Sequence, residues 1–186
     1  MARPRTRTKN IVLCALFIAL ITVGAYIRIP TPLIPITLQF FMTIMAGMLL
    51  GDKLGALSVL LYIVLGLIGV PVFATGGGIG YIFRPSFGYM IGFVIGAFVC
   101  GRMTAVAGGQ KFGRLFVAAL VDTAVVYTCG TVYCWLINAY YLNEAIGFWP
   151  LILSCILTPL PKDLLLCLLA AYLGKRLIPL VRNRAV

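Results

Sequence analysis

The sequence predicts an all-α integral membrane protein in which one bundle of six transmembrane helices, a single domain, occupies the whole chain. Of its 186 residues, 62% are hydrophobic and only 10% are charged, and the mean hydropathy is +1.10. A soluble domain could not cover so much apolar surface. Because a helix needs about 20 apolar residues to cross a bilayer, the length accommodates roughly six spans joined by short loops.

Six apolar runs, separated by charged or turn-forming residues, define the expected spans. The predicted helices cover residues 11–29, 37–50, 54–68, 86–101, 115–141 and 149–173. The first run is too long for the core of a signal peptide and no small-residue cleavage site follows it, so we expect it to be retained as a span. Pro30, Pro32 and Pro35 forbid a regular helix after it, which predicts an outer loop.

The basic residues are divided unequally between the two predicted sides. Twelve of the 15 lysines and arginines fall in the two tails and the predicted inner loops, whereas the predicted outer segments hold only Arg28 and Arg84. Cytoplasmic loops typically carry such an excess, so we expect a multi-pass protein of the plasma membrane with both termini in the cytoplasm. The net charge of +11 then indicates contact with anionic lipid. No basic, aromatic-rich soluble module indicates nucleic-acid binding.

The last apolar run contains a charge pair. Lys162 and Asp163 are adjacent in the middle of residues 152–173, shortly after Pro159 and Pro161. Ionisable groups at bilayer depth are costly and normally face a bundle interior or a cavity, and the prolines bend the helix that carries them. A structural pair that fixes helix packing is the alternative, but the pattern favours a functional polar site.

The connection over residues 69–87 combines glycines with aromatic residues. Gly77 belongs to a run of three glycines, and Phe73 and Tyr81 lie on either side of it, with Tyr89 just beyond. The run does not fit the phosphate-binding pattern G-x-x-x-x-G-K-[ST]. Glycine permits close approach of the backbone to a ligand, so we interpret the connection as a lid over a pocket.

The proline loop, this lid and the charge pair all fall in the outer half, which predicts a pocket for a small, partly apolar molecule. An ionised Asp163 can only accept hydrogen bonds, so it would select N–H donors such as an amide or ureido group. Such a charge-assisted bond contributes about 1.5–3 kcal/mol. The candidate ligand-binding residues are Asp163, Lys162, Arg84, Gln39, Phe73, Gly77, Tyr81 and Tyr89.

Two other classes of protein are alternatives to a transporter. An intramembrane aspartyl enzyme could use Asp122 and Asp163, although Asp122 lies near the predicted inner face. The chain has no histidine and no C-x-x-C pair, so a Ser/His triad, a zinc site and a haem site are all disfavoured, and no metal or cofactor is expected. A purely structural subunit would explain small residues at helical spacing but not the charge pair. No ATP-binding motif is present, so uphill uptake would need a partner that supplies energy.

Two stretches carry a resemblance to a known family. The run from Leu33 to Phe93 resembles the hallmark region of the BioY family; it includes PITLQFFMTIMAGMLLGDKLGAL (35–57) and GGGIGYIFRPSFGYMIGF (76–93). PLPKDLLL (159–166) resembles the family's second signature. BioY proteins are the biotin-specific substrate-binding (S) components of energy-coupling factor (ECF) transporters. The resemblance implies the six-helix S-component fold, outward-facing binding of biotin, and no enzymatic activity in this chain. A transmembrane T subunit and two ATPases that hydrolyse ATP are the implied partners.

Individual residues match the family's motifs. Asp163 matches the acid of the last span that binds biotin, and Ala15 and Ala19 match the A-x-x-x-A pattern that docks the T subunit. The family often has a lysine three residues after the acid, where this chain has Leu166, with Lys162 directly before the acid instead. Lys162 and Arg84 are therefore alternative cations for the biotin carboxylate. A related precursor such as dethiobiotin is the alternative ligand.

Overall fold

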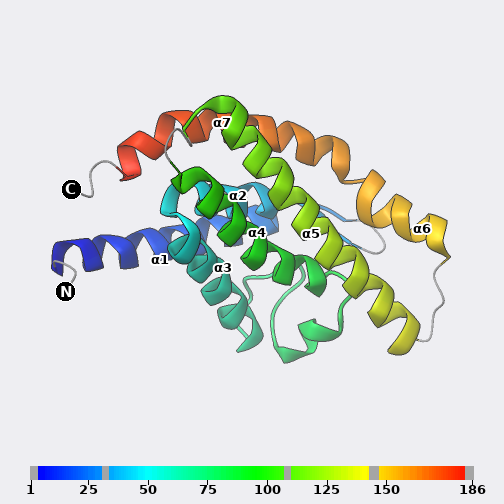
Figure 1. Ribbon diagram of the computed structural model, residues 1–186. Coiled ribbons are helices and arrows are strands. Elements are labelled where there is room, and N and C mark those ends of the chain that lie inside the picture. Colours follow the sequence, from blue (N-terminus) through cyan, green and yellow to red (C-terminus); the bar gives the residue numbers. More distant parts are fainter. Residues whose placement is uncertain (1–3, 31–33, 107–109, 143–146, 183–186) are drawn as a thin grey trace.

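The computed structural model describes residues 4–30, 34–106, 110–142 and 147–182, and it is a bundle of helices (Figure 1). Arg3, Pro32 and Arg184 lie outside these ranges. The described residues form six helical segments, as predicted. They are α1 (Pro4–Tyr26), α2 (Gln39–Leu50), α3 (Asp52–Leu67), α4 (Phe87–Ala105), α5 (Phe112–Tyr140) and a last segment composed of α6 (Phe148–Ile152), the π-helical turn η2 (Leu153–Leu157) and α7 (Leu160–Arg182).

Four of these segments are long and apolar enough to cross a membrane: Thr8–Tyr26, Phe87–Ala105, Phe112–Tyr140 and Phe148–Val181. The helices α2 and α3 are shorter, with 12 and 16 residues. Every residue of α2 except Met42 and Leu50 is buried. The short second helix is therefore the centre of the bundle, and its neighbours shield it from lipid.

Helices α4 and α5 pack closely along a stripe of glycines. Gly88, Gly92 and Gly96 recur at every fourth position of α4, so they lie on one face of that helix. A Cβ atom added at Gly92 would come within 2.8 Å of Val126 Cα on α5, and one at Gly96 would strike the Asp122 carboxyl group. Small residues that let two backbones approach are typical of membrane helix interfaces. The glycines therefore allow the close contact between α4 and α5.

The loop after α1 contains a short β-ribbon. α1 ends at Tyr26, and β1 (Arg28–Ile29) pairs antiparallel with β2 (Ile36–Thr37), so that Arg28 lies opposite Thr37. The first helix therefore stops before residue 29. The prolines that follow explain this, because they lack the N–H group that a helix needs.

The last helical segment is interrupted near Pro159 and Pro161, where the sequence predicted a bend. The Thr158 N–H donates to the Leu153 carbonyl (2.9 Å), which closes the π-turn, and the Asp163 N–H donates to the Pro159 carbonyl (3.1 Å). Proline is tolerated in the first turn of a helix, where its missing donor leaves no bond unmade. Pro161 therefore fits the start of α7, and Asp163 lies in the first turn of that helix.

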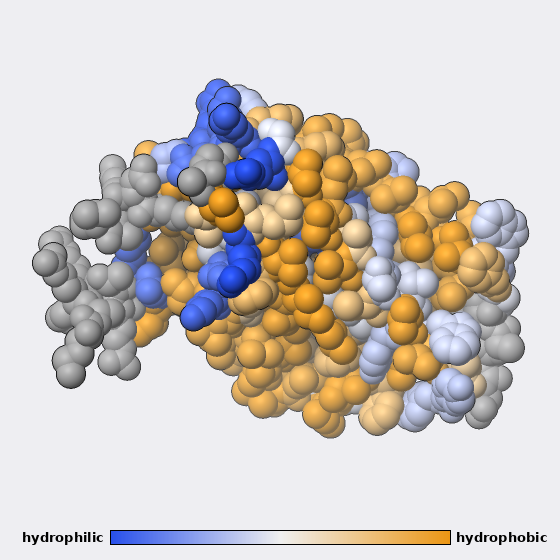
Figure 2. Space-filling model, viewed as in Figure 1, coloured by the Kyte–Doolittle hydropathy of each residue, from blue (hydrophilic) through white to orange (hydrophobic). Residues whose placement is uncertain are grey.

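Both termini lie at the same end of the bundle (Figure 1). The first and last helices are joined there, because the Lys9 ammonium donates to the Val181 carbonyl (2.7 Å). Arg102, near the end of α4, forms an ion pair with Asp52 at the α2–α3 turn (3.7 Å). Figure 2 shows strongly hydrophilic residues gathered toward this end and hydrophobic residues over much of the remaining face. An exposed apolar surface of this kind is suited to lipid.

Replacing Gly92 by alanine is expected to destabilise the bundle, because the added methyl group collides with the α5 backbone. Overpacking of this kind typically costs about 1–3 kcal/mol. Gly113→Ala in α5 is the matched control, since a Cβ atom there meets nothing within 4 Å. It should be neutral or stabilising by about 0.5–1 kcal/mol. Thermal unfolding of the purified variants in detergent measures both effects, and equal midpoints for the two variants would contradict the proposed packing.

Candidate functional site

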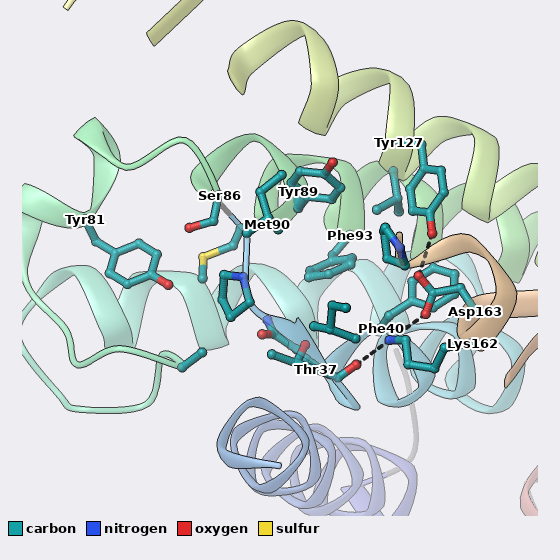
Figure 3. Close-up of a pocket in the computed structure, with 17 residues that line it drawn as sticks. Thr37, Phe40, Tyr81, Ser86, Tyr89, Met90, Phe93, Tyr127, Lys162 and Asp163 are labelled. Atoms are coloured by element: carbon teal, nitrogen blue, oxygen red, sulfur yellow. Dashed lines mark hydrogen bonds and ion pairs between the residues drawn. The ribbon is translucent and has the colours of Figure 1, made fainter. Parts of the chain in front are cut away.

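A cavity lies where α2, α4, α5 and α7 meet the β-ribbon (Figure 3). The proline loop, the glycine-aromatic connection and the charge pair all contribute to its wall, as predicted. The lining residues are Ile34, Pro35, Ile36, Thr37, Gln39, Phe40, Ala74, Tyr81, Ser86, Tyr89, Met90, Phe93, Val126, Tyr127, Pro159, Lys162 and Asp163.

The polar end of the cavity is organised around Asp163. The Tyr127 hydroxyl donates to its Oδ2 atom (2.6 Å), and the Lys162 ammonium lies 2.6 Å from its Oδ1 atom. The same ammonium donates to the carbonyl of Thr37 in β2 (2.6 Å). The Asp163 side chain is only 5% exposed, and an ionised carboxylate so buried needs such partners. Lys162 and Tyr127 therefore hold the carboxylate in place at the cavity wall.

The interruption of the last helical segment explains how adjacent residues reach one cavity. On a regular helix, neighbouring side chains point about 100° apart. Here Lys162 and Asp163 follow the Thr158–Pro159 turn and lie in the first turn of α7. The position also favours the negative charge, because the exposed N–H groups at a helix N-terminus carry partial positive charge. π-turns inside helices frequently mark functional sites, and η2 directly precedes this turn.

Aromatic side chains form the apolar walls between the two ends of the site. Figure 3 shows Tyr89 and Phe93 between the charge pair and Tyr81, which lies at the opposite end near Ser86. The Tyr89 hydroxyl donates to the Cys155 carbonyl in η2 (2.7 Å), which fixes its ring. A preformed apolar cavity with a few fixed polar groups is typical of sites that bind small ligands.

Gln39 presents a free donor at the start of α2. Its side chain is 3% exposed and contributes to the cavity wall. Within the described part of the chain, its Nε2 atom has no hydrogen-bond partner. Because leaving a buried donor unpaired costs about 1–3 kcal/mol, the amide is positioned to meet an acceptor on a ligand.

The cavity brings together five of the eight ligand-binding candidates: Asp163, Lys162, Gln39, Tyr81 and Tyr89. The other three do not line it. Arg84 donates to Thr75 Oγ1 (2.5 Å) and lies over the Tyr81 ring, 5.2 Å from its centroid.

Phe73 and Gly77 belong to the loop beside the cavity. Phe73 is fully buried and packs against Tyr81 with ring centroids 4.4 Å apart. A side chain at Gly77 would collide with the Val70 carbonyl. Both residues shape the wall from behind, since Tyr81 is the member of this group that lines the cavity.

Asp122 lies apart from the cavity. It is fully buried against Gly96 at the α4–α5 contact, and neither carboxyl oxygen has a hydrogen-bond partner among the described residues. The lining of the cavity includes Asp163 but not Asp122. The two acids that an aspartyl enzyme would need therefore have different surroundings.

Several lining residues were not among the sequence-based candidates, and Tyr127 is the most important. Its only signal was its place in a polar and aromatic section of the fifth span. Phe93 could have been found, because it lies one helical turn after Tyr89 and thus on the same face of α4. Phe40 directly follows Gln39. The main-chain carbonyl of Thr37 carries no sequence signal at all.

The described residues form a multi-pass bundle of six helical segments around a cavity that holds an ion pair, and its fold is the S-component fold. A crystal structure described as the S-component for biotin from an ECF-type ABC transporter matches with a TM-score of 0.80 and 28% sequence identity, over 95% of this chain and 94% of that one. The chain belongs to the BioY family, whose model matches residues 1–183.

Similar proteins with curated names are transporters. The probable biotin transporter BioY of Lysinibacillus sphaericus is 36% identical over 176 residues, which cover 95% of this chain and 90% of that protein. The probable biotin transporter BioY of Pyrococcus horikoshii is 40% identical over 149 residues, which cover 78% of this chain and 86% of that protein. The biotin transporter BioY of Thermotoga maritima is 33% identical over 150 residues, which cover 77% of this chain and 85% of that protein. These relatives are named as transporters, and the similar crystal structure is that of a transporter component.

Removing the ammonium group by Lys162→Met is expected to destabilise the fold, because Asp163 loses its nearest positive charge. Removing one partner of a buried ion pair lowers the free energy of unfolding by up to about 3–5 kcal/mol. Because Lys162 is partly exposed, we expect a loss of about 1–3 kcal/mol. The double variant Lys162→Met/Asp163→Asn should recover much of the loss, since no charge is then left unpaired. Thermal unfolding in detergent measures each variant, and equal losses in the single and double variants would contradict the pairing.

Proposed function

We propose that this protein is the biotin-binding S component of an ECF transporter and captures biotin for uptake into the cell. The observation that carries the proposal is the buried Asp163 carboxylate, held at the wall of the cavity by Tyr127 and Lys162. The names of the relatives and of the similar crystal structure support biotin as the ligand.

The polar groups of biotin match the polar end of the cavity. Its ureido ring offers two N–H donors and one carbonyl acceptor. A carboxylate has about four acceptor positions, so Asp163 keeps capacity for a ureido N–H beyond its bonds to Tyr127 and Lys162. The unpaired Gln39 amide is the matching donor for the ureido carbonyl. In this arrangement the ligand satisfies groups that are otherwise buried and unpaired.

The apolar part of biotin matches the aromatic walls. Its sulfur-containing ring and aliphatic chain would lie against Phe40, Tyr89 and Phe93, with the chain directed toward Tyr81 and Ser86 at the far end (Figure 3). In this orientation the carboxylate leaves the Lys162 end. Arg84, beside Tyr81, would then be the nearer of the two candidate cations.

Uptake against a gradient requires energy from partners, because the sequence contains no ATP-binding motif. We propose that α1 docks a transmembrane T subunit, which connects this chain to two ATPases that hydrolyse ATP. Ala15 and Ala19 are both exposed and lie one turn apart on α1, which supports this assignment. Small residues at this spacing allow another helix to approach closely. The chain itself would bind biotin without a cofactor or metal.

We further propose that both termini face the cytoplasm and that the cavity opens outward in the plasma membrane. The two termini share one end of the bundle with Arg102 and Asp52, and hydrophilic residues gather toward that end (Figures 1 and 2). The positive-inside tendency then orients that end toward the cytoplasm.

Asp163→Asn is expected to weaken biotin binding at least tenfold, because an amide cannot offer the same charge-assisted acceptors to the ureido ring. Isothermal titration of purified protein with biotin measures the change. Asp122→Asn is the matched control, since it makes the same substitution at a buried acid outside the cavity. Unchanged affinity in Asp163→Asn would remove this carboxylate from the ligand site. Parallel titration with dethiobiotin tests the alternative ligand, and tighter binding of dethiobiotin would favour it.

Replacing both Ala15 and Ala19 by leucine is expected to abolish cellular uptake of radiolabelled biotin while leaving biotin binding unchanged. The larger side chains would block close approach of another helix without reaching the cavity. Titration of the purified variant with biotin provides the control. Loss of binding would instead indicate that these residues support the packing of the bundle.

A further inference from the structure

The loop between α3 and η1 (Ile79–Phe83), which we call the 69–78 loop, forms one wall of the cavity through Ala74. Side chains from four different places in the fold hold consecutive parts of this loop. The Tyr26 hydroxyl donates a hydrogen bond to the Pro71 carbonyl, and the Tyr62 hydroxyl donates to the Val72 carbonyl (3.0 Å). The Arg28 guanidinium donates to the Ala74 carbonyl, and the Arg84 guanidinium donates to Thr75 Oγ1 (2.5 Å).

These four bonds differ in character. Tyr62 is fully buried on α3 and packs against the buried Phe73, so this part of the loop is anchored in the core. Arg28 instead reaches the loop from β1 and bonds the carbonyl of the residue that lines the cavity. A charged donor to a carbonyl makes a stronger hydrogen bond than a neutral one. The position of Ala74 therefore depends directly on Arg28.

Two glycines shape the loop on the side that Arg28 holds. Gly76 and Gly78 have φ angles of 112° and 106°, at which side chains are rarely accommodated. Phe73 and Gly76 exchange two backbone hydrogen bonds (3.0 and 3.2 Å), and the Gly78 N–H donates to the Gly66 carbonyl of α3 (2.7 Å). The bond from Arg28 adds to these backbone bonds and is the one of the four side-chain bonds that reaches Ala74 itself.

Arg28 also connects the loop to the charge pair. Its backbone lies opposite Thr37 in the β-ribbon, and the Thr37 carbonyl accepts the hydrogen bond from Lys162. One residue therefore joins the 69–78 loop on one side of the cavity to the Lys162–Asp163 pair on the other. Arg28 also lies two residues after Tyr26, the last residue of α1, which bonds the same loop.

We propose that Arg28 is a positioning residue that fastens the 69–78 loop over an occupied cavity and so determines how fast the ligand leaves. The inference rests on the proposed function, because biotin is taken as the occupant. Arg28 acts through Ala74 and does not touch the ligand, so its loss should accelerate dissociation while association stays nearly unchanged.

The experiment measures both rate constants for radiolabelled biotin on purified full-length protein, with excess unlabelled biotin as the chase. Arg28→Gln is expected to raise the dissociation rate constant about tenfold and to change the association rate constant less than about twofold, as loss of one charge-assisted bond predicts. Arg28→Lys keeps a charged donor and should recover most of the loss. Arg102→Gln removes an arginine at the opposite end of the bundle, where it pairs with Asp52, and is the matched control.

An unchanged dissociation rate constant in Arg28→Gln would overturn the inference. A loss of affinity caused by a lower association rate constant would also overturn it. Hydrogen exchange of the wild-type protein tests it without any substitution. Biotin should slow the exchange of amides in residues 74–78, and exchange unaffected by biotin would refute closure of the loop. Wild-type protein that binds no biotin would overturn the proposed function together with this inference. Normal binding by the wild-type protein, with the same rate constants in Arg28→Gln, would overturn this inference alone.

Discussion

A buried carboxylate that must be supplied with hydrogen-bond donors is the constraint on which the site depends. Asp163 receives the Tyr127 hydroxyl from α5 and the Lys162 ammonium from its own helix, and Lys162 also bonds the Thr37 carbonyl of β2. Leaving that carboxylate without partners in an apolar interior would cost several kcal/mol. The network therefore ties the outer loop, the fifth span and the last span together, and the cavity lies where they meet.

The apolar framework makes this arrangement rigid enough to serve as a binding site. The glycine stripe on α4 brings that helix against α5, and this contact places Tyr89 and Phe93 of α4 near Tyr127 of α5. The ring centroids of Tyr89 and Tyr127 are 6.3 Å apart in an edge-to-face arrangement. Close helix packing and the shape of the cavity are thus two results of the same small residues.

The sequence predicted the parts of the fold that produce strong local signals. Long apolar runs indicated six spans, and a charge pair inside an apolar run indicated the polar site. The role of Tyr127 was missed, because one tyrosine in an apolar span has no feature that shows its partner. Arg84, one of the two candidate cations, bonds Thr75 beside Tyr81 and does not line the cavity. The conformation of a loop depends on contacts distant in sequence, which the residue pattern alone does not specify.

The short central helix has a consequence for where the cavity lies in the bilayer. With 12 residues, α2 rises about 18 Å, whereas the hydrocarbon layer is about 30 Å thick. Gln39 and Phe40, in the first turn of α2, line the cavity. With the Asp52–Arg102 ion pair beyond the other end of α2 at one membrane surface, a molecule seated at Gln39 would lie below the lipid headgroups of the opposite surface. Groups on the protein, rather than water, must then form the hydrogen bonds of its polar atoms. The depth of the site itself therefore discriminates against molecules whose hydrogen bonds to water the protein cannot replace.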